Sequence, residues 1–351
     1  MKALDNKCPY CGASVSFDPK KQLWHCDYCD SDLTKEDLNK RNSNASSDEN
    51  NLKENNIEVD SYTCKSCGAT LIADENTAAT FCVYCGNTAI LKNKLTGTYA
   101  PDYIIPFKNT KEEIVENFKS LQKGRILMPK FFNNPKNIEK ITGVYIPFWL
   151  FDLKVKGEIN FDATRVRSWT SGDYRYTETK IYELKRGVDI NFNKIPADGS
   201  SHFDDELMQS LEPFKYDKLE KYNHAYLSGF LAEKYDVDKN TTFEIAKERA
   251  NTSATSEARA TCTGYSSVTK KNDSFEAQEI KTNYVLLPVW MLNVKFNSKN
   301  YIFAMNGQTG KIVGNIPVHK GKALLLWLVS FIGFMLICTL FWVVFIRWKS
   351  I

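Results

Sequence analysis

The sequence has little of the residue types on which common catalytic sites depend. It contains four histidines, and three of them, His202, His224 and His319, have no recognisable nucleophile or metal-binding motif beside them. The nearest approach to a phosphate-binding loop, Asn306-Gly-Gln-Thr-Gly-Lys311, lacks the required glycine spacing, a Ser or Thr after the lysine and a following helix. We expect a hairpin turn there instead. The sequence predicts no catalytic residues and no nucleotide site, so we expect a protein that is not an enzyme.

The amino terminus also lacks an apolar run behind its first lysine, so we expect no secretory signal peptide. Disorder is not a feature of the chain as a whole, because 43% of its residues are hydrophobic and 13% are aromatic. A chain of 351 residues is long enough for two or more folded units.

Charge is missing entirely from residues 323–346, a run of 24 residues. As a helix this run is about 36 Å long, which suffices to cross the hydrocarbon core of a bilayer. Lysines 320 and 322 precede it, and Arg347 and Lys349 follow. A buried core helix is the alternative, but a soluble helix of this length would rarely be apolar on every face. We therefore expect one transmembrane helix at 323–346 and a short tail at 347–351.

Eight of the ten cysteines form four Cys-x-x-Cys pairs. The pairs fall into two matching halves, and within each half fourteen residues separate the first pair from the second. An offset of 56 residues superposes the two halves, which indicates an internal duplication. The predicted metal ligands are Cys8, Cys11, Cys26 and Cys29 in the first half, and Cys64, Cys67, Cys82 and Cys85 in the second.

Two such pairs on neighbouring hairpins form a tetrahedral thiolate site, for which zinc is the usual metal. A segment this short buries too little apolar surface to fold alone, so metal binding supplies part of its folding energy. Iron in a rubredoxin-like site has the same ligands but is rarer. A redox dithiol needs only one pair inside a βαβ unit, and catalytic zinc needs an open coordination position. We therefore expect two structural zinc ions, one per ribbon, and His25 as a surface residue rather than a ligand.

The cysteines also decide the expected topology. Basic residues are equally frequent on both sides of the apolar run, so they favour neither orientation. Thiols that bind metal must stay reduced, which is a property of the cytosol. We expect a single-pass protein of the cell membrane with its soluble domains in the cytoplasm and its carboxyl terminus outside.

The expected fold class is multi-domain: two small β zinc ribbons, a mainly antiparallel α+β domain and one transmembrane α-helix. The boundaries are ribbon 1 at 1–37, a flexible Asn/Ser-rich linker at 38–61, ribbon 2 at 62–92 and the α+β domain at 97–319. On this model the ribbons are beads on a tether that fold independently of the α+β domain.

Within the α+β domain, Thr110 to Glu113 is a capping box that predicts a helix to about Lys123. Residues 203–211 and 223–260 are expected to be helical, with an interruption near 236–240. Alternation predicts an antiparallel hairpin over 161–188 around residues 170–173, and further strands at 103–107, 143–158, 284–294, 301–306 and 311–318.

A Pro-x-Trp-x-x-(Asp/Asn)-x-Lys pattern begins at Pro147 and again at Pro288, which suggests two related strands that pair with each other. The tryptophans could stack on a ligand, but aromatic residues dominate core burial, so we interpret them as core anchors.

The duplicated cysteine motifs, together with the segments at 103–108, 143–152 and 225–236 (AYLSGFLAEKYD) and the apolar run, resemble a group of bacterial membrane proteins. These carry transcription factor IIB-type zinc ribbons, and relatives are encoded beside an SPFH-like (flotillin-like) protein and a phage-shock protein A homologue. The resemblance implies an envelope-stress adaptor with those two proteins as partners. It supplies no catalytic residues.

Two functions remain open on this evidence. The first is a non-catalytic, tail-anchored membrane scaffold whose ribbons recruit proteins. The second is nucleic-acid binding, which requires a basic face. Residues 2–37 carry five Lys/Arg against seven Asp/Glu, and residues 62–92 carry two of each. This balance favours protein partners and disfavours nucleic acid, while the oligomeric state stays open.

Overall fold

The computed structural model describes residues 8–13, 15–38, 60–64, 70–72, 90–94, 101–123, 125, 127–129, 138, 140–233, 235–296, 299–315 and 318–349. The predicted linker at 38–61 lies almost entirely outside the described residues.

A single long strand, β8 (Thr142–Ser171, 30 residues), runs through most of the molecule. Its first part is a nearly continuous apolar run that is buried on both faces, and its far part is exposed. It folds back through a two-residue turn, where Gly172 has φ +59°, into β9 (Tyr174–Asp198). The antiparallel register runs from Ser171↔Tyr174 to Phe148↔Asp198. The hairpin predicted around residues 170–173 is confirmed, and its strands are longer than expected.

The other edge of β8 pairs with β12 (Ser267–Asp273) and β13 (Glu276–Phe296), both antiparallel. In this register Pro147 lies opposite Leu286 and Pro288 opposite Tyr145, so the two Pro-x-Trp segments are direct neighbours. The predicted pairing of the two segments is therefore confirmed.

Both tryptophans of the repeat anchor the core. Trp290 is 5% exposed, and its indole N–H donates to the Asn109 carbonyl at 3.2 Å. Trp149 donates in the same way to the Val237 carbonyl at 3.1 Å. A hydrogen bond from the indole N–H lowers the free-energy cost of burying this polar group together with the ring.

The remaining strands complete a mostly antiparallel sheet of twelve strands in the described part of the chain. They are β4 (Asp60–Cys64), β5 (Thr70–Ile72), β6 (Ile90–Lys94), β7 (Tyr103–Ile104), β10 (Glu220–Lys221), β11 (Leu231–Glu233), β14 (Lys299–Asn306) and β15 (Ile312–Gly314). Between β14 and β15, the Asn306 side-chain oxygen accepts from the backbone N–H groups of Gln308 and Thr309. The Asn306–Lys311 segment is thus the predicted hairpin turn.

Helix α2 (Lys111–Lys123) begins at the predicted capping box. The Thr110 N–H donates to the Glu113 carboxylate at 3.1 Å, and the Glu113 N–H donates back to the Thr110 hydroxyl at 3.3 Å. Helix α4 (Asp205–Ser210) is capped by the Asp204 side chain.

The prediction of a helix over 223–235 is wrong. Residues 224–227 form one 3₁₀ turn, Gly229 follows with φ +90°, and β11 then runs parallel to β8 and antiparallel to β5. A strand position between two neighbours offers these residues more buried contacts than an isolated helix would, so tertiary pairing overrides local propensity.

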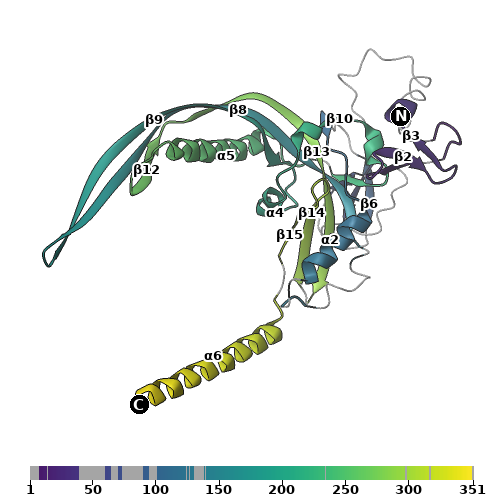
Figure 1. Ribbon diagram of the computed structural model, residues 1–351. Coiled ribbons are helices and arrows are strands. Elements are labelled where there is room, and N and C mark those ends of the chain that lie inside the picture. Colours follow the sequence, from purple (N-terminus) through teal and green to yellow (C-terminus); the bar gives the residue numbers. More distant parts are fainter. Residues whose placement is uncertain are drawn as a thin grey trace.

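Helix α5 (Lys239–Ala260) lies along the concave side of the long β8–β9 hairpin (Figure 1). Its buried face is made of small residues at helical spacing: Thr242, Ala246, Ala250, Ala254 and Ala258. Alanines let the helix axis approach the sheet closely, and the sheet supplies the bulk in the shared core, with Phe151, Phe161 and Leu184.

Helix α6 (Lys320–Lys349) extends away from the sheet (Figure 1). Its segment Lys320–Trp342 has a mean hydropathy of 2.6 and none of it is buried against the rest of the chain. Before it, the His319 N–H donates to the Leu127 carbonyl at 2.8 Å. Among the described residues, α6 is the one helix long and apolar enough to span a membrane, as predicted.

The alanine face of α5 gives a direct test of this packing. Ala250→Leu introduces side-chain volume into a site with no exposed surface, and we expect it to cost about 1–3 kcal/mol of stability. The exposed Thr252→Leu is the matched control and should change stability by less than about 0.5 kcal/mol. Thermal unfolding of the detergent-solubilised chain measures both, and equal melting temperatures would contradict the packing described.

Candidate metal centre

The four cysteines of the first half, Cys8, Cys11, Cys26 and Cys29, converge on one point. Their sulfur atoms all lie within 4.8 Å of one another. The Cys8–Cys29 and Cys11–Cys26 sulfur distances are 3.6 and 3.5 Å. Tetrahedral coordination with metal–sulfur bonds of about 2.3 Å places the sulfurs about 3.8 Å apart, so the cluster has the size of a tetrathiolate site.

Two tight backbone turns direct the sulfurs inward. In the first, the Gly12 N–H donates to the Cys8 carbonyl at 2.9 Å, and Gly12 has φ +80°. In the second, the Asp30 N–H donates to the Cys26 carbonyl at 2.8 Å, and Asp30 has φ +57°. A left-handed backbone thus follows the second cysteine of the pair at both turns, with an aspartate in the second turn at the position that glycine holds in the first.

The thiols of the cluster hold unequal pKa values. The backbone N–H groups of Cys29 and Tyr28 favour the Cys26 thiolate and lower its pKa to about 7. At Cys11 the Ala13 N–H lowers the pKa, but burial and the three neighbouring cysteines outweigh it and raise it to about 12. Four thiolates this close repel one another unless a cation lies between them. The donor set and its geometry therefore fit a metal ion with a preference for sulfur.

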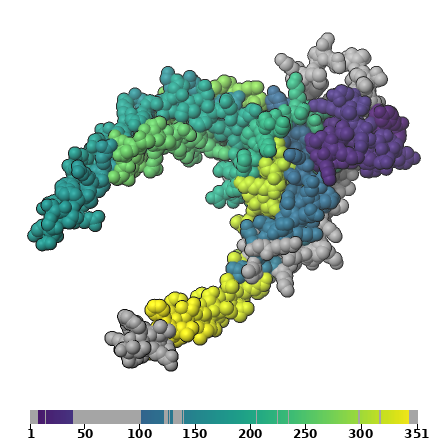
Figure 2. Space-filling model, viewed as in Figure 1, coloured from purple at the N-terminus to yellow at the C-terminus, as the bar shows by residue number. Residues whose placement is uncertain are grey.

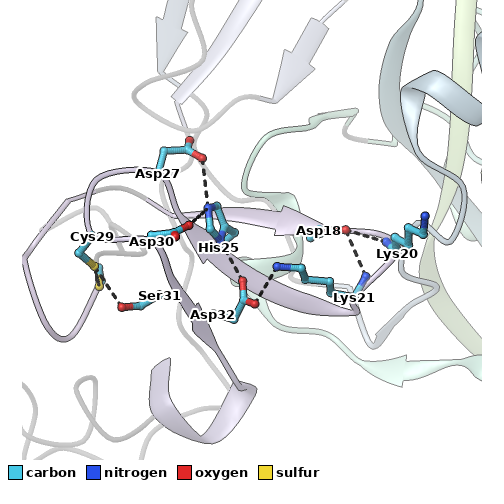
Figure 3. A network of polar contacts seen from close by, with 10 residues as sticks. Asp18, Lys20, Lys21, His25, Asp27, Cys29, Asp30, Ser31 and Asp32 are labelled. Atoms are coloured by element: carbon cyan, nitrogen blue, oxygen red, sulfur yellow. Dashed lines mark hydrogen bonds and ion pairs between the residues drawn. The ribbon is translucent and has the colours of Figure 1, made fainter.

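A second set of polar contacts surrounds His25, next to the cluster (Figure 3). The ring Nδ1 lies 2.9 Å from Asp32, and Nε2 lies 3.5 Å from Asp30 and 3.7 Å from Asp27. The hydrogen bond to Asp32 raises the pKa of His25. His25 is thus surrounded by carboxylates and is not part of the cysteine cluster, although its side chain is only 25% exposed rather than fully on the surface.

The cysteine unit (residues 8–38) is built on strands β1 (Ser16–Asp18), β2 (Leu23–Cys26) and β3 (Ser31–Leu33). Trp24 on β2 is 2% exposed, and its indole N–H donates to the Ala225 carbonyl at 2.7 Å. The rings of Trp24 and Phe17 lie 5.0 and 5.3 Å from that of Tyr226. The segment 225–230 of the large sheet domain is therefore the surface on which the cysteine unit docks.

This docking corrects the expectation that the first cysteine unit is a domain that folds independently of the α+β domain. Its apolar residues belong to the same buried cluster as Ile104, Phe107 and Tyr145 of the sheet. A unit with so few apolar residues gains stability by sharing the core of its neighbour.

The second cysteine set mostly falls outside the described residues. This holds for Cys67, Cys82 and Cys85, and of Cys64 only the backbone is described, as the last residue of β4. The strands around it join the large sheet, since β5 pairs with β11 through Ala232↔Ile72 and Glu233↔Leu71. The second set of ligands stays a prediction.

The structure also reveals a polar cluster that the sequence did not disclose. Glu233 is 1% exposed, and its carboxylate accepts from the Ser200 hydroxyl at 2.8 Å and faces Nδ1 of His202 at 3.0 Å. Asp236 lies 3.4 Å from the same nitrogen. Asp204, two residues after His202, caps helix α4. Glu233 and Asp236 both belong to the 225–236 segment. Their shared place in this segment is the feature of the sequence that could have pointed to the cluster.

Fold and site together define a class of protein: a mostly antiparallel sheet domain that carries a cysteine cluster able to bind metal at one end of the chain and an apolar, membrane-length helix at the other. Comparison with curated proteins finds the uncharacterized protein YdjG of Bacillus subtilis (strain 168), which is 41% identical over 234 residues. The match covers 67% of this chain and 69% of YdjG. The chain belongs to the YdjG family. No family model and no solved structure matches it.

The metal centre is tested by removing one ligand. Cys11→Ser is expected to lower the metal content of the purified chain by one equivalent, because three sulfurs hold the ion far more weakly than four. Cys338→Ser, in α6 and outside the cluster, is the matched control and should leave the metal content unchanged. Elemental analysis gives the stoichiometry, and an unchanged metal content in Cys11→Ser would refute the assignment.

The His202 cluster predicts a pH effect. Hydrogen bonding to Glu233 raises the pKa of His202 in the folded state. The contact therefore stabilises the folded state fully below the pKa of histidine in the unfolded chain, about 6.5. This stabilisation is lost as the pH rises through the pKa of His202 in the folded state. The free energy of unfolding of the wild type, measured relative to His202→Gln, should therefore fall by about 1 kcal/mol or less between about pH 6 and 8. The change is small because solvent partly screens the ring.

Denaturant unfolding at several pH values measures that difference. The exposed Thr252→Gln, which removes no titratable group, is the control, and its difference from the wild type should not change with pH. A wild-type advantage that grows with pH would contradict the assigned pairing.

Proposed function

We propose that the protein is a non-catalytic membrane adaptor, held in the cell membrane by α6, whose cysteine units bind structural zinc and present a surface to other proteins. The soluble part lies in the cytoplasm and the short tail after α6 lies outside. The partners proposed are an SPFH-like (flotillin-like) protein and a phage-shock protein A homologue, in the response to envelope stress.

A structural rather than catalytic metal is supported by the coordination. Four sulfurs within 4.8 Å of one another fill a tetrahedral shell and leave no position for water or substrate. Zinc is the metal that such shells usually hold, and the second cysteine set is proposed to hold a second ion in the same way. When bound, the ion cross-links the two turns of the unit and so stabilises its fold.

The observation that carries the adaptor proposal is the docking of the cysteine unit. The unit is fixed on the sheet domain through Trp24 and Phe17, at the end of the molecule remote from α6 (Figure 2). A surface held this way projects from a membrane in a defined orientation, which lowers the entropic cost of binding a partner.

Charge favours a protein partner over nucleic acid, the second candidate. Asp27 and Asp30 are 87% and 97% exposed beside the metal centre, and Asp32 lies next to them. Carboxylates at this density repel phosphates, whereas non-specific nucleic-acid binding depends on cationic side chains. The exposed Tyr10 and Tyr28 on the same unit offer rigid aromatic contacts of the kind that protein interfaces favour.

The test uses the full chain in nanodiscs together with the purified SPFH-like protein and phage-shock protein A homologue of the same bacterium. We expect at least one of them to bind, and Asp27→Lys/Asp30→Lys to weaken binding about fivefold to tenfold, because reversed charge at an interface opposes association. Asp217→Lys/Glu244→Lys changes the same charge at exposed sites elsewhere and should have no effect.

Two results would contradict this account. One is no binding of either protein. The other is salt-sensitive binding of a single-stranded or duplex oligonucleotide that the two aspartate substitutions strengthen, which would instead support the nucleic-acid function.

A further inference from the structure

The far end of the β8–β9 hairpin extends beyond every other element that covers the sheet. We call residues 165–181 the hairpin tip. Helix α5 ends at Ala260, and β12 pairs with β8 only as far as Thr164. Arg165 marks the boundary, where its guanidinium donates to the Gly264 carbonyl at 3.1 Å. From there to Gly172 the described part of the chain supplies β8 with one strand partner, β9.

The hairpin tip exposes aromatic and aliphatic side chains that a soluble, unpartnered hairpin would not carry. Trp169 and Tyr176 lie opposite each other on the two strands, with ring centroids 5.7 Å apart and planes 14° apart. Both are nearly half exposed, and Tyr174 and Ile181 are 72% and 78% exposed. Such a patch marks a surface that meets something other than water.

The tip is also basic. It carries Arg165, Arg167, Arg175 and Lys180 against Asp173 and Glu178. The Arg167 guanidinium lies over the Trp169 ring, 5.9 Å from its centroid. Indole and phenol rings next to arginine and lysine are the combination found where proteins meet the headgroup region of a bilayer.

We propose that the hairpin tip docks on anionic phospholipid headgroups of the same bilayer that holds α6. The arginines and Lys180 approach lipid phosphates, and Trp169, Tyr174 and Tyr176 enter the interface. The protein then contacts the membrane at two points, the α6 helix and the hairpin tip. This inference depends on α6 crossing a bilayer and not on the identity of any protein partner.

The shape of the molecule makes this contact attainable. The hairpin and α6 project from the same side of the sheet domain (Figures 1 and 2). A strand of 30 residues spans about 100 Å, so the tip reaches well beyond the rest of the sheet domain. Because α6 already confines the chain to the membrane, the tip meets lipid at a high effective concentration, and a weak surface contact becomes well populated.

A nucleic acid is the other polyanion that basic and aromatic residues bind. The membrane is favoured because α6 places the tip beside a bilayer permanently, whereas the tip's four cations, partly offset by two carboxylates, form a small phosphate-binding surface.

The test is a lipid-proximity measurement on the full chain, labelled with 5-fluorotryptophan, at one chain per nanodisc. A gadolinium-chelating lipid broadens the ¹⁹F signal of any tryptophan near the headgroups. The signal of Trp169 is identified by its loss in Trp169→Phe. Trp327 in α6 is the positive control, and the buried Trp24 of the cysteine unit is the negative control.

In nanodiscs that contain phosphatidylglycerol we expect Trp169 to broaden together with Trp327, while Trp24 stays sharp. In phosphatidylcholine alone the Trp169 broadening should fall at least threefold. Arg167→Glu/Arg175→Glu/Lys180→Glu should abolish it, since each basic residue contributes about fivefold to affinity for an anionic surface. Lys218→Glu/Lys221→Glu/Lys299→Glu makes the same charge change at exposed sites elsewhere and should leave it intact.

The proposal is overturned if Trp169 stays sharp in anionic discs in which Trp327 is broadened, or if broadening is equal in both lipids. It is also overturned if an added oligonucleotide removes the Trp169 broadening in anionic discs, because the tip would then prefer nucleic acid. None of these results depends on the binding of a partner protein.

Discussion

The pairing of β8 with its neighbours is the constraint on which the rest of the structure depends. This strand pairs with β9, β11, β12 and β13, so it joins segments from residue 142 to residue 296 in one sheet. Gly157 within it has φ +152°, and a Cβ there would lie 2.3 Å from the Ser274 carbonyl oxygen. Close backbone approach at this glycine therefore accommodates the connection at residues 274–275 between β12 and β13, which follow each other along the same edge of β8.

The same sheet supports three other parts of the molecule. At one end, the turn at 225–230 receives Trp24 and Phe17 and so fixes the cysteine unit. Along its concave side, α5 supports the hairpin through alanines. Near α6, the Lys322 amine donates to the Met128 carbonyl at 3.1 Å. The cysteine cluster, the hairpin tip and the start of α6 are therefore held by one folded body rather than by separate domains.

Much of this could be predicted from the sequence where the signal is local. The capping box at Thr110, the turn at residues 170–173 and the sulfur-directing Cys-x-x-Cys turns each depend on a few neighbouring residues. The docking of Trp24 could not be predicted, because its partner Ala225 lies 201 residues away and any apolar surface would satisfy the same pattern. The sequence predicts a helix over 223–235 for the same reason, because the strand β11 within this range exists only through its pairing with β8 and β5. The same strand buries Glu233, which is 1% exposed.

The most direct test of this account is native-state hydrogen exchange of the metal-loaded chain in nanodiscs. If the cysteine unit and the sheet share one core, amides of Trp24 and Phe17 on one side and of Phe230 and Leu231 on the other should exchange with the same opening free energy. The opening free energies of both groups of amides should then fall together when a chelator removes the metal. If the cysteine unit opened at a lower free energy while the 225–231 segment kept its full protection, the two would be independent units, and the central claim of a single body would be contradicted.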